Sequence, residues 1–243
     1  MNLAERKERW ARFCDVRQPA LHPILVRMDE QLPERPLPHP DKKSERIEWS
    51  WQQYLRQMER AAWLDDDRIP CLDVYTGTEI FAEAFGCPVH RRDDDMPFAR
   101  PLVRDASEVA RLRVPGLDAP PLRTVFEIAD ALRAKAGPDA VMKMADIQSP
   151  MGIAALIWDK HGFYTSFVEA PDAVRELADK VKQLLVAFLD EWYARYGEDF
   201  VAHFPDYYIP KGITLSEDEI GAVSADVFAE FFEPDLVELS QRY

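Results

Sequence analysis

The sequence predicts an α/β fold, a partial (β/α)8 barrel of the TIM type that follows an N-terminal helical extension. Three observations support this class: short apolar runs alternate with amphipathic helical patterns, turn residues separate them, and three such units follow one another. This alternation is typical of a parallel sheet. Three units are fewer than the eight of a closed barrel, so we expect the chain to stop before the barrel closes. An open domain completed by a partner is the alternative.

Composition excludes several classes of protein. With 243 residues, 47% hydrophobic and 30% charged, the chain has the profile of a globular protein. The net charge of −14 argues against nucleic acid as a partner. No window holds the roughly 18 consecutive apolar residues of a membrane helix, and the charged start lacks the apolar stretch of a signal peptide. We therefore expect a cytoplasmic protein with no membrane contact.

The N-terminal extension is predicted to span residues 1–64. Residues 3–14 and about 43–63 have helical periodicity. Between them, residues 32–40 carry alternating prolines, which exclude a helix, so this stretch should lie extended on the surface. The acidic run Asp65–Asp67 is expected to be an exposed linker to the barrel, which we assign to residues 65–243.

The first unit of the predicted barrel is a strand over Ile69–Tyr75, followed by the loop Thr76–Thr78. A helix over Glu79–Phe85 then ends at Gly86. Residues 87–120 contain five prolines and a charged run, which predicts a long loop with a functional or covering role.

The second unit begins at Thr124, which forms a capping-box pattern with Glu127 at the start of a helix that Gly137 ends. A strand over Val141–Ile147 and an exit loop over Gln148–Gly152 follow it.

In the third unit, Pro171 lies in the first turn of a long amphipathic helix, and Gly197 follows its end. Tyr208–Leu215 is the third strand candidate, and a last helix is predicted from Ser224 to about Ser240.

Active sites of parallel α/β folds lie at the carboxyl ends of the strands, and this rule selects the candidate residues. We predict that four carboxylates are catalytic: Asp146, Asp73, Glu217 and Asp218. We predict that six further side chains bind substrate: Tyr75, Thr76, Glu79, Gln148, Arg91 and Arg100. Thr78, Ser149, Ser216 and Glu219 lie in the same predicted loops.

Each of these candidates also has a structural interpretation. Asp146 either binds a ligand or accepts hydrogen bonds from loop amides and shapes the turn. Ser216 and Glu219 fit a helix cap. The loop arginines either hold a polycarboxylate or form a solvated surface with the neighbouring aspartates; they are Arg91, Arg92, Arg100 and Arg104.

Motifs for nucleotide binding, zinc peptidases and serine hydrolases are absent from the sequence. The five histidines are isolated, and Cys14, Cys71 and Cys87 are odd in number and far apart, which predicts reduced thiols and no metal site or cofactor within this chain.

Four stretches together resemble the uroporphyrinogen decarboxylase superfamily, and the resemblance covers about residues 65–243. They are Thr76–His90, Asp94–Val103, Ala145–Gly152 and Ser224–Pro234. The last looks like the family's helix with a serine and an x-E-F-x-x-P motif, in which Pro234 should kink the helix. The superfamily includes the haem-pathway decarboxylase and zinc-dependent methyltransferases that act on corrinoid carrier proteins.

The resemblance implies a substrate that is a small molecule, a tetrapyrrole or a corrinoid. The decarboxylase has an arginine-rich signature after its first strand, where this sequence has Asp73–Gly77, so we expect methyl transfer between a corrinoid and an acceptor rather than decarboxylation. In the methyltransferases the zinc ligands lie beyond the position of Tyr243, and the 243-residue chain alone is expected to be inactive. The alternatives are a cofactor-free uroporphyrinogen-type decarboxylase and a non-catalytic assembly module that pairs its open edge with a second chain, for example as a homodimer.

Overall fold

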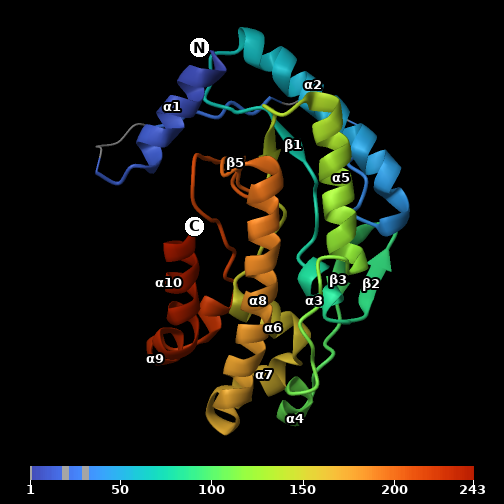
Figure 1. Cartoon of the computed structure of the whole chain (residues 1–243), viewed down its shortest axis with the longest axis vertical. Helices are drawn as coiled ribbons and strands as arrows, with labels where there is room; N and C mark the ends of the chain where they lie inside the picture. Colours follow the sequence, from blue (N-terminus) through green and yellow to red (C-terminus); the bar gives the residue numbers. More distant parts are fainter. Residues whose placement is uncertain (1, 18–21, 29–32) are drawn as a thin grey trace. The chain divides into compact units, whose positions relative to one another are not determined.

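The computed structural model describes residues 2–17, 22–28 and 33–243 (Figure 1). The chain divides into two compact units. The first contains residues 1–75, 125–145 and 193–212, and the second contains residues 76–124, 146–192 and 213–243. Two long helices, α5 (Pro120–Ala136) and α8 (Pro171–Tyr196), have residues in both units. The predicted division after residue 64 stays a prediction.

Two helices of the first unit begin and end where the sequence periodicity predicts. α1 spans Leu3–Cys14, and α2 spans Lys43–Trp63 after a 3-10 turn at Pro40–Lys42. The Asn2 side chain caps α1, because it accepts the Glu5 amide at 2.9 Å while the Glu5 carboxylate accepts the Asn2 amide at 2.8 Å. The described part of the proline-rich connection forms no helix or strand before Pro40, as predicted, and residue 32 lies outside the described residues.

The first unit contains a four-stranded sheet with the order β1-β4-β5-β6. β1 (Cys71–Asp73), β4 (Val141–Lys143) and β5 (Phe200–Val201) are parallel, whereas β6 (Tyr208–Ile209) is antiparallel to β5. The predicted α/β class with parallel strands is therefore confirmed, although the strands are shorter than the apolar runs that contain them.

The prediction that residues 208–215 form the third parallel strand is wrong. Phe200 and Val201 occupy that position, pairing with Met142 and Lys143. Residues 208 and 209 fold back on β5 instead, with Tyr208 opposite Val201. A strand of two residues directly after a helix has too little periodicity to be recognised in a sequence.

The core of the first unit packs α1 against the sheet. Trp10 forms a buried cluster with residues of the strands and their flanks: Ile69, Cys71, Val141, Val201 and Tyr208. The prediction of an exposed acidic linker is wrong for Asp66 and Asp67, which are each 2% exposed. Arg6 lies 3.3 Å from Asp66, and Arg9 donates to Asp67 at 2.6 Å, so both buried carboxylates are paired.

The second unit begins with α3 (Ile80–Ala84), close to the predicted helix. The predicted long loop after it is wrong in its first part, because β2 (Val89–Arg92) and β3 (Asp95–Ala99) form an antiparallel hairpin, followed by α4 (Ala106–Val109). β2 is charged and only half-buried, so it lacks the apolar alternation that identifies a strand.

Helices form the rest of the second unit. They are α6 (Pro150–Ile157), α7 (Lys160–Glu169), most of α8, a 3-10 turn at Glu219–Ala222, α9 (Ala225–Val227), a π-helical segment at Phe228–Phe232 and α10 (Glu233–Arg242). The last helical stretch begins directly after Ser224, close to the predicted start, and the Ser224 side chain caps α9. The regular helix is interrupted by the π-helical segment just before Pro234. The predicted exit loop at 148–152 is shorter than expected, because Ser149 caps α6 and Pro150 begins it.

The predicted capping box at Thr124 is wrong, because α5 already begins at Pro120. The Thr124 hydroxyl instead donates to the Pro120 carbonyl at 2.8 Å, inside the helix.

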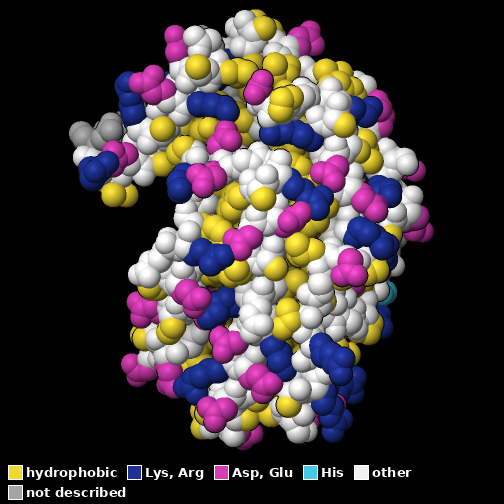
Figure 2. Space-filling model, viewed as in Figure 1, with side chains coloured by type: hydrophobic (Ala, Val, Ile, Leu, Met, Phe, Trp, Pro, Cys, Tyr) yellow, Lys and Arg dark blue, Asp and Glu magenta, His cyan; other side chains and the backbone are white. Residues whose placement is uncertain are grey.

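None of the helices among the described residues has both the length and the apolar composition needed to cross a bilayer. On the face shown in Figure 2, basic and acidic side chains are interspersed.

Candidate functional site

A charged cluster lies at the carboxyl ends of two parallel strands in the first unit. Asp73 and Lys143 are register partners at the last positions of β1 and β4. The Lys143 ammonium lies 3.8 Å from Asp73 Oδ2 and 2.6 Å from Asp206 Oδ1. Asp73 and Lys143 are 9% and 8% exposed. This is the edge of the sheet at which parallel α/β proteins place their sites.

Backbone contacts fix the predicted catalytic residue Asp73 in this cluster. Its amide donates to the Ser50 hydroxyl at 3.1 Å, and its Oδ1 accepts the Tyr75 amide at 2.8 Å. Tyr75 has a φ of +35°, in the left-handed region, which turns the chain out of β1. Arg46 of α2 donates to the carbonyls of Val74 and Tyr75 at 3.1 and 2.8 Å. α2 therefore holds both β1 and its exit loop.

Lys143 is a fixed cation. Burial lowers its pKa, but the carboxylates of Asp73 and Asp206 outweigh this effect and raise the pKa above the ordinary lysine value. The ammonium is thus suited to holding anionic groups rather than to acting as a base. The neighbouring thiol is inert for a related reason, because burial raises the pKa of Cys71 to about 12.

Arg35 adds a second cation to the same cluster. Its guanidinium lies between two aromatic rings, 4.7 Å from the centre of Trp49 and 4.2 Å from the centre of Tyr75. It also lies 3.7 Å from Asp73 Oδ2. The predicted site residues Asp73 and Tyr75 are thus brought together by an arginine from the proline-rich connection.

These residues surround a cavity of about 200 Å³. Its lining consists of Arg35, Trp49, Gln53, Gln57, Arg68, Ile69, Cys71, Asp73, Lys143, Val201 and Asp206. Three cations and two carboxylates line this cavity, with the side-chain amides of Gln53 and Gln57 from α2 beside them. Such a lining favours a polar or anionic small molecule.

Sequence reasoning missed four charged residues of this cavity: Arg35, Arg68, Lys143 and Asp206. Lys143 could have been identified, because a lysine inside an otherwise apolar strand is costly to bury without a partner. Arg35, Arg68 and Asp206 lie in irregular segments, and no local pattern distinguishes them from exposed residues.

A second polar cluster lies entirely within the second unit. The loop after β4 pairs with residue 216 through a parallel bridge between Gln148 and Ser216, which brings the predicted acidic residues to this loop. Gln148 Nε2 donates to Asp218 Oδ2 at 3.1 Å. The Ser149 hydroxyl donates to the Glu217 carboxylate and also accepts the Gly152 amide at 2.9 Å as the cap of α6.

Glu217 has an unusual environment for a carboxylate. Burial raises its pKa, and the neighbouring Glu219 and Asp218 carboxylates raise it further, while hydrogen bonds from Ser149 and the Glu219 amide oppose the shift. A carboxyl group whose pKa is raised is suited to proton transfer.

The predicted cap formed by Ser216 and Glu219 is wrong. Ser216 makes backbone hydrogen bonds to Ile147 and Ser149, both at 2.9 Å. The buried carboxylate of Glu219 accepts from the Tyr164 hydroxyl and pairs with Lys160, and burial together with Glu219 raises the pKa of Tyr164 to about 12. The Glu219 carboxylate therefore binds Tyr164 and Lys160, and the N-cap residue of the 3-10 turn at Glu219–Ala222 makes no side-chain cap.

Other predicted site residues of the second unit have structural partners. The Asp146 amide donates to the Thr76 hydroxyl at 3.0 Å. A Cβ on Gly77 would lie 2.1 Å from Glu79 Oε2, so a larger residue at position 77 would require this buried carboxylate to move.

On the hairpin, Arg91 pairs with Glu83 at 2.7 Å, and Arg100 contacts His90 Nδ1 at 2.9 Å. Arg91 therefore has a carboxylate partner within its own unit.

The predicted residues fall into two sets. Asp73 and Tyr75 belong to the first unit, and all the others belong to the second. That the two sets form one site stays a prediction.

Among the residues that the structure describes, no group of three His, Cys, Asp or Glu side chains is placed to hold a metal ion. The described residues therefore do not fit the zinc of the methyltransferase branch.

Comparisons with known proteins agree with the resemblance found in the sequence. A methyltransferase from Methanosarcina mazei has the same fold, with a TM-score of 0.65 and 13% sequence identity over 98% of this chain. The chain spans 66% of the length of that methyltransferase, just under two thirds. The comparison with curated proteins gave no match. The model of the family described as "Uroporphyrinogen decarboxylase (URO-D)" matches residues 72–232. The chain belongs to the uroporphyrinogen decarboxylase family.

Proposed function

We propose that this chain is part of an enzyme that transfers a methyl group between a corrinoid and an acceptor, and that its parallel strands belong to a (β/α)8 barrel. The family supports an enzyme of this superfamily, and one similarly folded protein is a methyltransferase. The substrate in this proposal is a corrinoid, free or on a carrier protein.

The observation that carries the proposal is the charge balance at the end of β1. Asp73 and Asp206 face the cavity beside Lys143. A tetrapyrrole with many carboxylates would be repelled by these two fixed carboxylates, and three cations are too few to neutralise it. A small acceptor with one anionic group matches the lining better.

The residues of this cavity have defined tasks in the proposal. Lys143 and Arg35 hold the anionic part of the acceptor, and Asp73 takes the proton that a thiol acceptor releases. In that step the S–H bond breaks and its proton passes to Asp73. The sulfur electron pair forms the bond to the methyl carbon, and the corrinoid keeps the pair of the bond that breaks.

Methyl transfer from methylcobalamin to a panel of small anionic thiols tests the proposal in the full-length protein. The absorbance of the corrinoid should change with turnover, and Asp73→Asn should slow it by about 10²–10⁴-fold. Asp93→Asn, in the exposed turn of the hairpin, is the matched control. Absence of methyl transfer, together with conversion of uroporphyrinogen to coproporphyrinogen, would establish the decarboxylase instead.

A further inference from the structure

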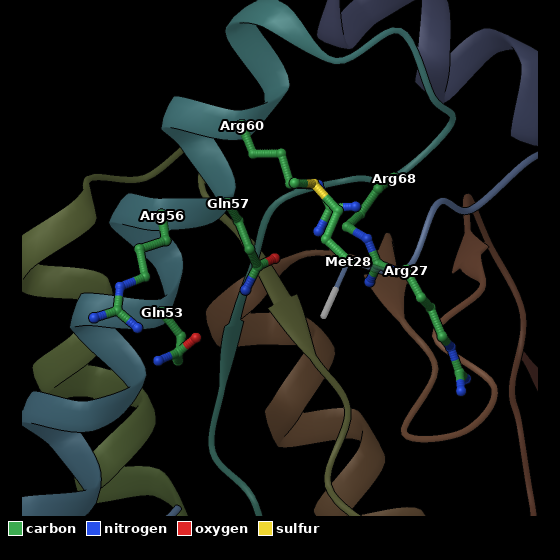
Figure 3. Close-up of a pocket in the computed structure, with 7 residues that line it drawn as sticks. All are labelled: Arg27, Met28, Gln53, Arg56, Gln57, Arg60 and Arg68. Carbon is green, nitrogen blue, oxygen red and sulfur yellow. The ribbon is translucent and has the colours of Figure 1, made fainter. Parts of the chain in front are cut away.

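A second cavity in the first unit is lined almost entirely by hydrogen-bond donors. It encloses about 290 Å³ beside α2 (Figure 3). Its lining consists of Arg27, Met28, Gln53, Arg56, Gln57, Arg60 and Arg68. Figure 3 shows Gln53, Arg56, Gln57 and Arg60 projecting from α2, with the Arg60 side chain extending toward Met28 and Arg68. Four arginines therefore line one cavity, and none of its described lining residues carries a carboxylate.

Little negative charge from the described part of the chain balances these four arginines. Among the described residues, Arg27, Arg56 and Arg60 form no ion pair. Arg68 lies 3.9 Å from Asp206, but that carboxylate is already bound by Lys143 at 2.6 Å. Cations that line one cavity repel one another, and the repulsion is stronger where water is partly excluded. An arrangement of this kind is favourable when an anion occupies it.

Two buried nitrogen atoms in this lining have unused donor capacity. Arg60 Nε and Arg68 Nε are buried and have no hydrogen-bond partner among the described residues. A buried donor without an acceptor is costly, so an acceptor bound here would be favourable. Arg60 is held in place at its other end, because its Nη2 donates to the Val26 carbonyl. Its orientation is thus fixed by the fold, while part of its donor capacity is unused.

We propose that this cavity binds the phosphoryl group of a small ligand. Guanidinium forks bind phosphate oxygens in a bidentate manner, and a phosphoryl or pyrophosphoryl group has more acceptor oxygens than a single carboxylate. The amides of Gln53 and Gln57 add neutral donors to the same wall. The net charge of the chain is −14, so this basic cavity contrasts with the chain as a whole.

The phosphoryl cavity adjoins the cavity that contains Asp73 and Lys143. Gln53, Gln57 and Arg68 line both of them. A ligand anchored by its phosphoryl group can therefore extend along α2 toward the strand ends. This binding site goes beyond the proposed methyl transfer and does not depend on it.

Titration calorimetry of the full-length protein with pyrophosphate tests this proposal, with citrate as the polycarboxylate probe. Pyrophosphate should bind one site per chain, more tightly than citrate and more weakly as the salt concentration rises. Arg56→Gln and Arg60→Gln should each weaken binding by about tenfold or more, since a hydrogen bond to a charged group contributes about 1.5–3 kcal/mol. Arg111→Gln, an exposed arginine of the second unit, should leave binding unchanged.

Arg56 is exposed, so its substitution tests the charge without disturbing the packing of α2. Arg60→Lys keeps the charge and removes the fork, and it should give an intermediate loss. Equal affinity of the wild type, Arg56→Gln and Arg60→Gln would overturn the proposal, as would tighter binding of citrate than of pyrophosphate. These measurements need no methyl transfer, so their failure is distinguishable from failure of the proposed enzyme activity.

Discussion

Lys143 and Asp206 are 63 residues apart in the sequence, yet Lys143 Nζ lies 2.6 Å from Asp206 Oδ1. The pair joins the end of β4 to the segment between β5 and β6. Because Lys143 also faces Asp73, one ammonium group compensates two carboxylates at the strand ends. Removing one partner of a buried ion pair leaves an uncompensated charge, which is costly.

The first prediction concerns the substitution Lys143→Met. It should lower the free energy of unfolding by about 3 kcal/mol or more, because Asp73 and Asp206 lose their shared cation. Urea unfolding measures the change. Lys211→Met removes an exposed lysine that pairs with Glu198 and should cost less than about 1 kcal/mol. A loss of similar size in both variants would contradict the role of Lys143.

A second prediction follows from the raised pKa of Glu217. A carboxyl group whose pKa is higher in the folded state stabilises the fold below its ordinary value of 4.5, and this contribution is lost as the pH rises through the folded pKa. Glu217→Gln cannot ionise, so it should be more stable relative to the wild type at pH 7 than at pH 4. Urea unfolding at both pH values is the measurement, and an equal difference at the two would rule out a raised pKa.

Ser149 connects a helix cap with the acidic loop. Ser149→Ala removes the cap of α6 and should cost about 1 kcal/mol of unfolding free energy. It also removes the hydroxyl that donates to Glu217, so its effect should not be additive with that of Glu217→Gln. A double-mutant cycle by urea unfolding measures the coupling. Ser107→Ala, in the exposed start of α4, is the matched serine, and additive effects of Ser149→Ala and Glu217→Gln would show that no coupling exists.

The stacked guanidinium of Arg35 leads to a fourth prediction. Arg35→Ala loses contacts with Trp49 and Tyr75 and should cost about 1 kcal/mol of unfolding free energy. Arg35→Lys keeps the charge but not the planar group, so it should recover only part of that loss. Urea unfolding of the three proteins gives both values. Full recovery by lysine would mean that charge alone, and not stacking, holds this residue.

Long helices were predictable because their signal is local. α1 and α2 have the predicted bounds, and α8 runs from Pro171 to the residue before Gly197, because an amphipathic period repeats over many residues and caps mark the ends. The family resemblance was likewise readable from ordered short motifs. The hairpin of β2 and β3 and the two-residue β5 were missed, since neither has an apolar pattern long enough to recognise.

The candidate sites divide in the same way. Asp73 lies beside a cavity at a strand end, where the rule of strand ends selected it. Glu217 and Asp218 lie in one polar cluster with Gln148, although the strand from which they were selected does not form. The rule did not predict Arg35, Arg68, Lys143 or Asp206, which complete the first cavity from distant parts of the chain.

The sequence by itself determined the α/β class, the long helices and the family, because each depends on patterns among neighbouring residues. Only the tertiary structure decided which charges are buried and what they bind. Asp66 and Asp67 look like an exposed linker in the sequence, but Arg6 and Arg9 of α1 make their burial possible. The cost of burying a charge depends on partners that lie close in space, and the chain supplies those partners from positions tens of residues away.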